Sequence, residues 1–140
     1  MLSHDTIGRV QRSWALVLPI APRAAELFYA NLFAADPSLR GMFRGDMQAQ
    51  GLRLMGMISA AVGQLDRLDT LVPVLRELGR RHEGYGVRPA HYDTVGTALL
   101  ATLEQGLGEA FTPPVRAAWV TVYGVLAGTM MQACAEAEPA

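Results

Sequence analysis

Residues 71–86 read LVPVLRELGRRHEGYG, and the apolar positions of this run recur every three or four residues. That spacing is typical of one buried face of an α-helix. The face is formed by four residues, Leu71, Leu75, Leu78 and His82. Gly84 and Gly86 then indicate where the helix ends. An imidazole therefore follows a row of leucines on an inward face, where burial without a partner is unfavourable.

Helical spacing recurs along the rest of the chain, and no run alternates apolar and polar residues long enough for a strand. Capping signals mark three helix starts, at Ser3, at Asp36-Pro37 and at Thr112-Pro113. The predicted inward faces are Ile7, Val10, Trp14 and Val17; Ala25, Phe28, Tyr29, Leu32 and Phe33; Gln50, Leu54, Met57 or Ile58, and Ala61; Tyr92, Val95, Leu99 and Leu103; and Val115, Trp119, Val122, Leu126 and Met130. The pattern predicts an all-α protein with six or seven helices.

Composition narrows the class of protein further. With 140 residues, one domain spanning 1–140 with one core is expected. A hydrophobic share of 51% and a net charge of −1 argue against disorder, and they give no electrostatic reason to expect nucleic acid or an anionic membrane as a partner. The single cysteine, Cys134, fits a reducing compartment, and the N-terminus lacks a basic patch followed by an apolar run. We therefore expect a cytoplasmic protein.

One stretch, residues 117–135, contains no charged side chain. Its length nearly suffices to span a bilayer. However, no basic flank orients the stretch, and several small or polar residues lower its hydrophobicity. These residues are Thr121, Gly124, Gly128, Thr129 and Gln132. The prediction is a helix buried on most sides in a soluble core, with no stable membrane insertion.

Most sequence signatures of catalytic or nucleotide-binding sites are absent. The chain has no phosphate-binding Walker loop, no GxGxxG, no paired cysteines for zinc, no HExxH and no GxSxG. Single carboxylates are scattered over polar faces, as on a solvated surface. A catalyst built from side chains alone is therefore not expected.

What remains is polar groups on apolar faces, namely His82, Tyr29 and Gln50. Taken alone, a histidine on an inward face is more often a core residue bonded to a carbonyl than a ligand aimed at a metal, and both alternatives stay open for His82. Glutamine is rarer on an inward face, because its amide needs several partners. Three such groups on three helices indicate a cavity, and a small helical domain with one inward histidine suggests haem. His4, near the terminus, and His91, just after Pro89, are predicted to be surface or packing residues.

With these residues in view, the chain resembles bacterial single-domain globins of the Vitreoscilla type and the globin half of flavohaemoglobins, in particular those with a distal Tyr/Gln pair. The likeness extends over about residues 3–135. It is carried by FYANLF (28–33), DPSLRGMF (36–43), LGRRHEGYGV (78–87), AHYDTVG (90–96) and AAWVTVYGV (117–125).

The resemblance implies haem b as cofactor, with His82 as the proximal ligand to the iron. It implies that Tyr29 and Gln50 stabilise a distal ligand, because a hydroxyl and an amide can both donate hydrogen bonds in a pocket of low dielectric. The remaining haem-binding positions are Phe43 against the porphyrin, Leu54 in the distal pocket, Arg81 toward a propionate, and Val87, Tyr92, Val95 and Tyr123 on the proximal side.

One position departs from the family. A glutamate of the last helix, which pairs in the family with the tyrosine matching Tyr92, is replaced here by Cys134. Glu136 lies two residues further, about 200° around a helix, and is expected to face elsewhere. The resemblance therefore implies less imidazolate character on His82, and weaker support for peroxidase-like chemistry.

Two functions follow from the resemblance. One is reversible binding, storage or delivery of dioxygen; the alternative is a nitric oxide dioxygenase, which oxidises NO to nitrate. At 140 residues the sequence leaves no room for a flavin domain, so turnover is expected to need an external reductase. A gas sensor and a plain helical domain without haem are weaker alternatives. The oligomeric state is expected to be a monomer or homodimer.

Overall fold

The computed structural model describes residues 2–43 and 45–137, with side chains described as far as Cys134. This part contains six α-helices and no strand, which confirms the all-α prediction. The α-helices are α1 (His4–Val17), α2 (Ala21–Ala35), α3 (Met47–Gly63), α4 (Leu68–Gly84), α5 (Pro89–Leu107) and α6 (Pro113–Ala137). Four short 3-10 helices join them: η1 (Leu18–Ile20), η2 (Pro37–Met42), η3 (Leu65–Arg67) and η4 (Gly108–Ala110).

The predicted caps are the residues that begin the helices. The Ser3 hydroxyl accepts a hydrogen bond from the Thr6 amide at 3.1 Å, and the Asp36 carboxylate accepts one from the Ser38 amide at 3.1 Å. Thr112 caps α6 in the same way, at 3.4 Å. Each side chain satisfies a backbone N–H that has no partner within its helix, and these local contacts fix the boundaries that the sequence pattern predicts.

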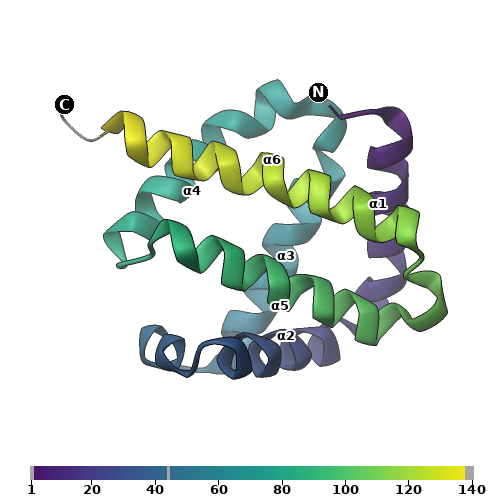
Figure 1. Ribbon diagram of the computed structural model, residues 1–140, viewed down its shortest axis with the longest axis horizontal. Helices are drawn as coiled ribbons and strands as arrows, with labels where there is room; N and C mark the ends of the chain where they lie inside the picture. Colours follow the sequence, from purple (N-terminus) through teal and green to yellow (C-terminus); the bar gives the residue numbers. More distant parts are fainter. Residues whose placement is uncertain (1, 44, 138–140) are drawn as a thin grey trace.

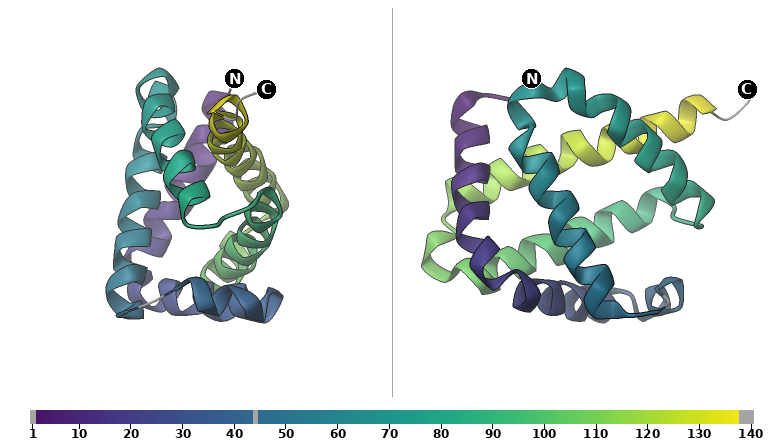
Figure 2. Two further views of the ribbon diagram at one scale, coloured as in Figure 1. Left: turned by 90° about the vertical axis from the view of Figure 1, so that its left-hand side faces the viewer. Right: turned by 180° about the vertical axis from the view of Figure 1, so that it is seen from behind.

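The helices form two walls, α3 with α4 and α5 with α6, and a floor made by α2. In Figure 1, α5 and α6 run side by side, with α2 along the lower edge. The left view of Figure 2 shows α3 and α4 on one side, α5 and α6 on the other, and α2 closing the lower end. Helix α6 packs against α4 and α1, while α2 packs against α5 and α3. The candidate site lies between the two walls and is bordered by residues at the end of α4 and the start of α5.

Two apolar clusters hold the helices together. The larger contains the fully buried Val10, Leu32 and Val122, and a smaller one joins α4, α5 and α6. The Trp14 and Trp119 rings meet at 5.9 Å within the larger cluster. Their indole N–H groups donate to the hydroxyls of Ser59 and Ser13, each at 2.8 Å, so both buried donors are satisfied.

Helix α3 differs from the prediction in which face is buried. Its buried residues are Gly51, Met55 and Val62. The predicted stripe lies on the neighbouring face: Leu54, Ile58 and Ala61 are half-buried, and Met57 is 46% exposed. The physical reason is that the stripe borders a cavity, while the small Gly51 permits close contact with Ala25 of α2.

Helix α6 is the charge-poor segment of the sequence. Its residues Pro113–Cys134 are long and apolar enough to cross a membrane by length and composition, and 33% of the apolar window is buried. This fraction is smaller than the expected burial on most sides, because the inner face of α6 partly lines the cavity and the outer face, with Val120, is exposed. The same helix packs on α1, α4 and α5, as a core helix does.

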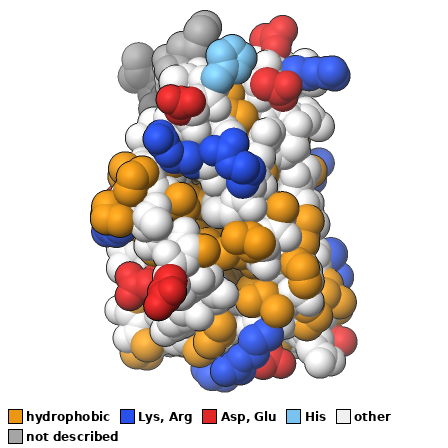
Figure 3. All heavy atoms as spheres, turned by 90° about the vertical axis from the view of Figure 1, so that its right-hand side faces the viewer, with side chains coloured by type: hydrophobic (Ala, Val, Ile, Leu, Met, Phe, Trp, Pro, Cys, Tyr) orange, Lys and Arg blue, Asp and Glu red, His pale blue; other side chains and the backbone are white. Residues whose placement is uncertain are grey.

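Figure 3 shows the side of the molecule formed by α1 and the corner between α5 and α6. Apolar side chains gather here, and Leu16 and Leu18 are exposed by 58% and 48%. A shallow hollow on this side is lined by Arg9, Arg12, Ser13, Leu16, Ala110 and Val115. It shares no residue with the larger cavity.

Candidate functional site

A cavity of about 390 Å³ lies between the two walls. That volume falls within the range of about 300–1,000 Å³ that is usual for pockets holding small molecules and cofactors. Eight of the residues predicted for the site line it: Tyr29, Phe43, Leu54, His82, Val87, Tyr92, Val95 and Tyr123. They come from five helices and two connecting segments, so the fold gathers residues that are widely separated in the sequence.

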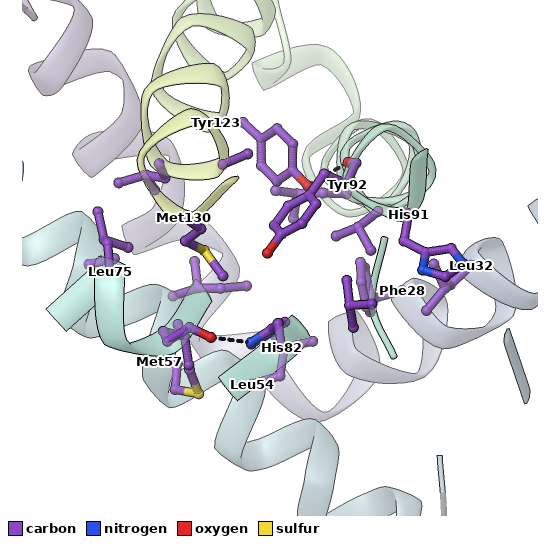
Figure 4. Close-up of a pocket in the computed structure, with 18 of the residues that line it drawn as sticks. Phe28, Leu32, Leu54, Met57, Leu75, His82, His91, Tyr92, Tyr123 and Met130 are labelled. Carbon is purple, nitrogen blue, oxygen red and sulfur yellow. Dashed lines mark hydrogen bonds between the residues drawn. The ribbon is translucent and has the colours of Figure 1, made fainter. Parts of the chain in front are cut away.

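His82 occupies the last turn of α4 and is half-buried at the cavity wall. Its Nδ1 lies 2.7 Å from the carbonyl oxygen of Leu78. A carbonyl only accepts, so Nδ1 must carry the proton of this bond, and Nε2 of the neutral ring is left with a lone pair. Figure 4 shows the ring fixed by this bond at the edge of the cavity. The structure therefore contains the carbonyl partner of the first alternative. This contact is also compatible with the second alternative, because histidines that bind a metal usually donate their other ring N–H to a carbonyl or carboxylate.

Tyr29 lies on the floor of the cavity and is only 9% exposed. Its ring stacks on Phe33 at 6.0 Å and meets Phe28 and Phe43 edge-on at 5.5 and 5.4 Å. Burial raises the pKa of its hydroxyl, an effect that nearby Arg53 partly offsets. The phenol therefore stays protonated at neutral pH and can donate a hydrogen bond to a molecule in the cavity.

Two predicted residues lie outside the cavity lining. Gln50 is half-buried on α3, and its amide nitrogen would lie 3.8 Å from a Cβ placed on Gly45. The amide thus lies near the turn that precedes α3, so the Tyr/Gln pair stays a prediction. Arg81 is exposed, with its Nε 3.6 Å from a carboxylate oxygen of Glu77. It neighbours His82 in sequence, at the end of α4.

The wall formed by α5 and α6 carries two tyrosines, of which one has a hydrogen-bonded hydroxyl and the other does not. The Tyr123 hydroxyl donates to the backbone carbonyl of Tyr92 at 2.6 Å, and burial raises its pKa. The Tyr92 hydroxyl is buried and has no hydrogen-bond partner among the described residues. In Figure 4 it points into the cavity, toward the side of His82 and Met130. A buried hydroxyl without a partner is unfavourable, which indicates that a bound molecule or water completes this site.

Cys134 stands at the position where the resembled globins have a glutamate. Its thiol donates to the carbonyl oxygen of Gly79 at 3.2 Å. Burial raises the pKa of Tyr92, and the nearby Cys134 and Glu83 raise it further. The side chain of Glu136, which the sequence places on another face, lies outside the described residues.

The sequence pattern missed several residues at the cavity mouth. Met42, Met57 and Tyr85 line the cavity, yet they are 38%, 46% and 71% exposed. Tyr85 follows His82 by three residues, with ring centroids 6.5 Å apart, and this helical spacing could have revealed it. His91 also reaches the lining, but its Nδ1 accepts from the Arg88 amide at 2.9 Å, which agrees with its predicted packing role.

These features fit a metalloporphyrin. The lining is overwhelmingly apolar, as a porphyrin ring requires, and its exposed methionines and tyrosine would be covered by a flat ligand. His82 presents a ring nitrogen with a lone pair. Among the described residues no group of three or more His, Cys, Asp or Glu side chains could hold a metal ion. A metal bound through His82 would therefore take its other ligands from a cofactor.

Comparison with known proteins agrees with the site. The Globin family model matches residues 26–130, which is most of the chain, and the chain belongs to the globin family. Among its relatives are the flavohemoproteins of Bacillus subtilis, 31% identical over 130 residues, and of Vibrio cholerae, 30% identical over 130 residues. Each alignment covers 91% of this chain but only 33% of the relative, so the chain spans about a third of their length.

Solved structures show the same fold. The flavohemoglobin of Malassezia yamatoensis, determined with bound FAD and haem, superposes with a TM-score of 0.80 at 26% identity. That match covers 96% of this chain and 37% of the other. An engineered carbene transferase from Rhodothermus marinus superposes with a TM-score of 0.85 at 24% identity, covering 97% of this chain and 95% of that one.

Proposed function

We propose that this chain binds haem b through His82 and holds dioxygen reversibly beside Tyr29. The observation that carries the proposal is the 2.7 Å contact between Nδ1 of His82 and the Leu78 carbonyl oxygen at the wall of an apolar cavity. Haem supplies an iron that takes small diatomic gases when it is ferrous. The remaining contributions come from the side chains around it.

Each side chain has a distinct role in this proposal. His82 offers Nε2 as the protein's ligand, with the ring orientation set by Leu78. Tyr29, held by its aromatic neighbours, would donate a hydrogen bond to the bound gas. Leu54 and Phe43, with the rest of the apolar lining, exclude bulk water from the bound gas. Gln50 is the proposed second donor, and Arg81 the proposed partner of a haem propionate.

Haem binding is tested by adding hemin to the apoprotein. The wild type and the His4→Ala control, whose imidazole is exposed near the N-terminus, should both take up one haem and develop its Soret band. His82→Ala should lose the band or hold haem loosely, and added free imidazole should restore it. If His82→Ala binds hemin with unchanged spectrum and affinity, the ligand assignment is wrong.

Dioxygen binding is tested by stopped-flow displacement of the gas from the ferrous protein. Tyr29→Phe should release dioxygen at least about tenfold faster, because one charge-assisted hydrogen bond contributes about 1.4 kcal/mol or more. Tyr85→Phe is the matched control, since it removes a hydroxyl at the exposed mouth of the same cavity. Equal release rates for the wild type and Tyr29→Phe would place the hydroxyl away from the gas.

A second candidate function is nitric oxide dioxygenase activity supported by a separate reductase. The Rhodothermus marinus protein, which matches nearly end to end, is provisionally described as a nitric oxide dioxygenase. The flavohemoprotein relatives are about three times as long as the matched region, and a flavin is bound in the related Malassezia structure. Slow gas release with negligible NO turnover would favour storage, and repeated turnover with added reductase would favour the enzyme.

A further inference from the structure

The charge of this chain is distributed unevenly along the sequence. Residues 40–53 and 76–91 together contain seven arginines and three acidic residues, a balance of +4. The whole chain carries −1, so the remaining residues carry −5. The near-neutral total therefore conceals a strongly polarised molecule, and the fold decides where the positive part lies.

The first positive segment passes along the cavity on the side of η2 and α3. Arg40 lies between two lining residues of η2, and its guanidinium sits 5.0 Å from the centre of the Phe33 ring. Arg53 precedes the lining residue Leu54 and is close enough to Tyr29 to lower its pKa against the effect of burial. Both arginine side chains are exposed, and the one acid of this segment, Asp46, caps α3.

The second positive segment comprises the end of α4 and the start of α5. Arg81 precedes His82, and Arg88 follows the lining residue Val87, so both neighbour the cavity in sequence and both are exposed. Of the two acids here, Glu77 is held in ion pairs with Arg80 and Arg81 at 3.7 and 3.6 Å, and Glu83 is exposed. The left view of Figure 2 shows η2, the end of α4 and the start of α5 on the same side of the molecule, and residues of all three line one cavity.

Exposed apolar side chains lie within this positive surface. Met42, Met57 and Tyr85 are exposed and line the cavity mouth. Apolar contacts surrounded by charges of one sign are typical of surfaces that meet a partner of the opposite charge. The four exposed arginines nearest to the lining residues, Arg40, Arg53, Arg81 and Arg88, carry +4, which exceeds the charge of the two carboxylates of a bound haem.

We infer that this arginine face, made of Arg40, Arg53, Arg81 and Arg88 around the cavity mouth, is the docking surface for an acidic flavoprotein that acts as reductant. The inference rests on the second candidate function, because repeated nitric oxide dioxygenase turnover needs a source of electrons. A flavin hydroquinone docked there would become a neutral semiquinone by giving one electron to ferric haem iron held by His82, which would become ferrous, and by releasing one proton to water. Long-range attraction between the faces would speed encounter by about 10- to 1,000-fold at low salt.

The test is binding of reduced flavodoxin, an acidic flavoprotein, measured by calorimetry at low and at physiological ionic strength. Screening lengths fall from about 30 Å at 0.01 M salt to about 8 Å at 0.15 M, so affinity for the wild type should drop at least about tenfold. The double variant Arg40→Glu/Arg88→Glu brings the face from +4 to zero. It should lose both the affinity and its salt dependence.

The matched control is Arg67→Glu/Arg116→Glu, which makes the same change of net charge at two exposed arginines outside the face. It should bind flavodoxin almost as the wild type does. Equal loss in both double variants, or no binding by the wild type at low salt, would overturn the inference. Binding of the wild type to phosphatidylglycerol vesicles, but not to flavodoxin, would also overturn it and assign the face to membranes.

Failure of the proposed function has a different signature. Hemin uptake is measured separately for every variant, and both double variants should develop the same Soret band as the wild type. If no form takes up hemin, the haem proposal fails, while flavodoxin binding to the apoprotein still reports on the surface. If all forms take up hemin and flavodoxin does not discriminate between the double variants, only the docking inference fails.

Discussion

Substitution of Gly79 by alanine tests how the fold positions the histidine. Gly79 lies on α4 where it meets α6, and an added Cβ would lie 2.8 Å from both the Cα and the carbonyl carbon of Met130, and closer still to the carbonyl oxygen. Carbon atoms pack best at about 3.5–4.0 Å, so the two helices would have to separate by about 0.7 Å or more. The contacted atoms are backbone and cannot rotate away.

The expected loss of stability follows from two opposing effects. Forced overpacking costs about 1–3 kcal/mol, and a clash with backbone belongs at the upper end of that range. Alanine in place of glycine within a helix contributes up to about 1 kcal/mol in the other direction. Gly79→Ala should therefore destabilise the apoprotein by about 2 kcal/mol, and lower its melting temperature by about 4–8 °C.

The assay is urea unfolding of the apoprotein followed by far-UV circular dichroism. Gly56→Ala is the control, because Gly56 lies within α3 and an added Cβ would have no neighbour within 4 Å. That variant should gain about 0.5–1 kcal/mol. Haem should also leave Gly79→Ala faster than the wild type, since His82 lies three residues further along the displaced helix. Equal stability of the two variants would refute the close approach of α4 and α6.

Two further predictions concern the tyrosines. Tyr92→Phe should stabilise the apoprotein by about 1–2 kcal/mol in urea unfolding, because it removes a buried hydroxyl that lacks a partner; a loss of stability would mean that the hydroxyl is satisfied. The second prediction concerns alkaline pH, because burial raises the pKa of Tyr29, Tyr92 and Tyr123 above the ordinary value of 10.0. The folded chain then retains protons that the unfolded chain releases, so this stability is complete below pH 10 and is lost as the pH rises through the folded-state values. The free energy of unfolding should begin to fall near pH 10 and fall further as the pH rises above it, and less so in Tyr123→Phe; a decrease of equal size in that variant would contradict the assignment.

The sequence pattern predicted the residues whose environment is set locally. Ser3, Asp36 and Thr112 cap the helices that they were expected to begin, because capping depends on atoms two or three residues away. His82 could be recognised because three leucines at helical spacing lead to it. The imidazole's partner, the Leu78 carbonyl, lies one turn back in the same helix.

What the pattern could not supply depends on long-range packing. An apolar stripe looks the same whether it faces a core or a cavity, so Leu54 and Ile58 were predicted to be inward while Met55 is the buried residue. Tyr85 follows His82 at helical spacing, but it was missed because the predicted face was taken to end at Gly84. The orientation of Gln50 depends on the turn at Gly45, which helical periodicity does not describe.

The paired indoles of the core give the protein an optical signal of its own. Trp119 lines the cavity, and the ring of Trp14 packs against the ring of Trp119. The chain has no other tryptophan. Porphyrins absorb near the wavelengths at which indoles emit. A porphyrin bound in this cavity would therefore quench the fluorescence of both rings by resonance energy transfer. The native emission should therefore dim in proportion to occupancy, which allows cofactor capture to be followed without any attached dye.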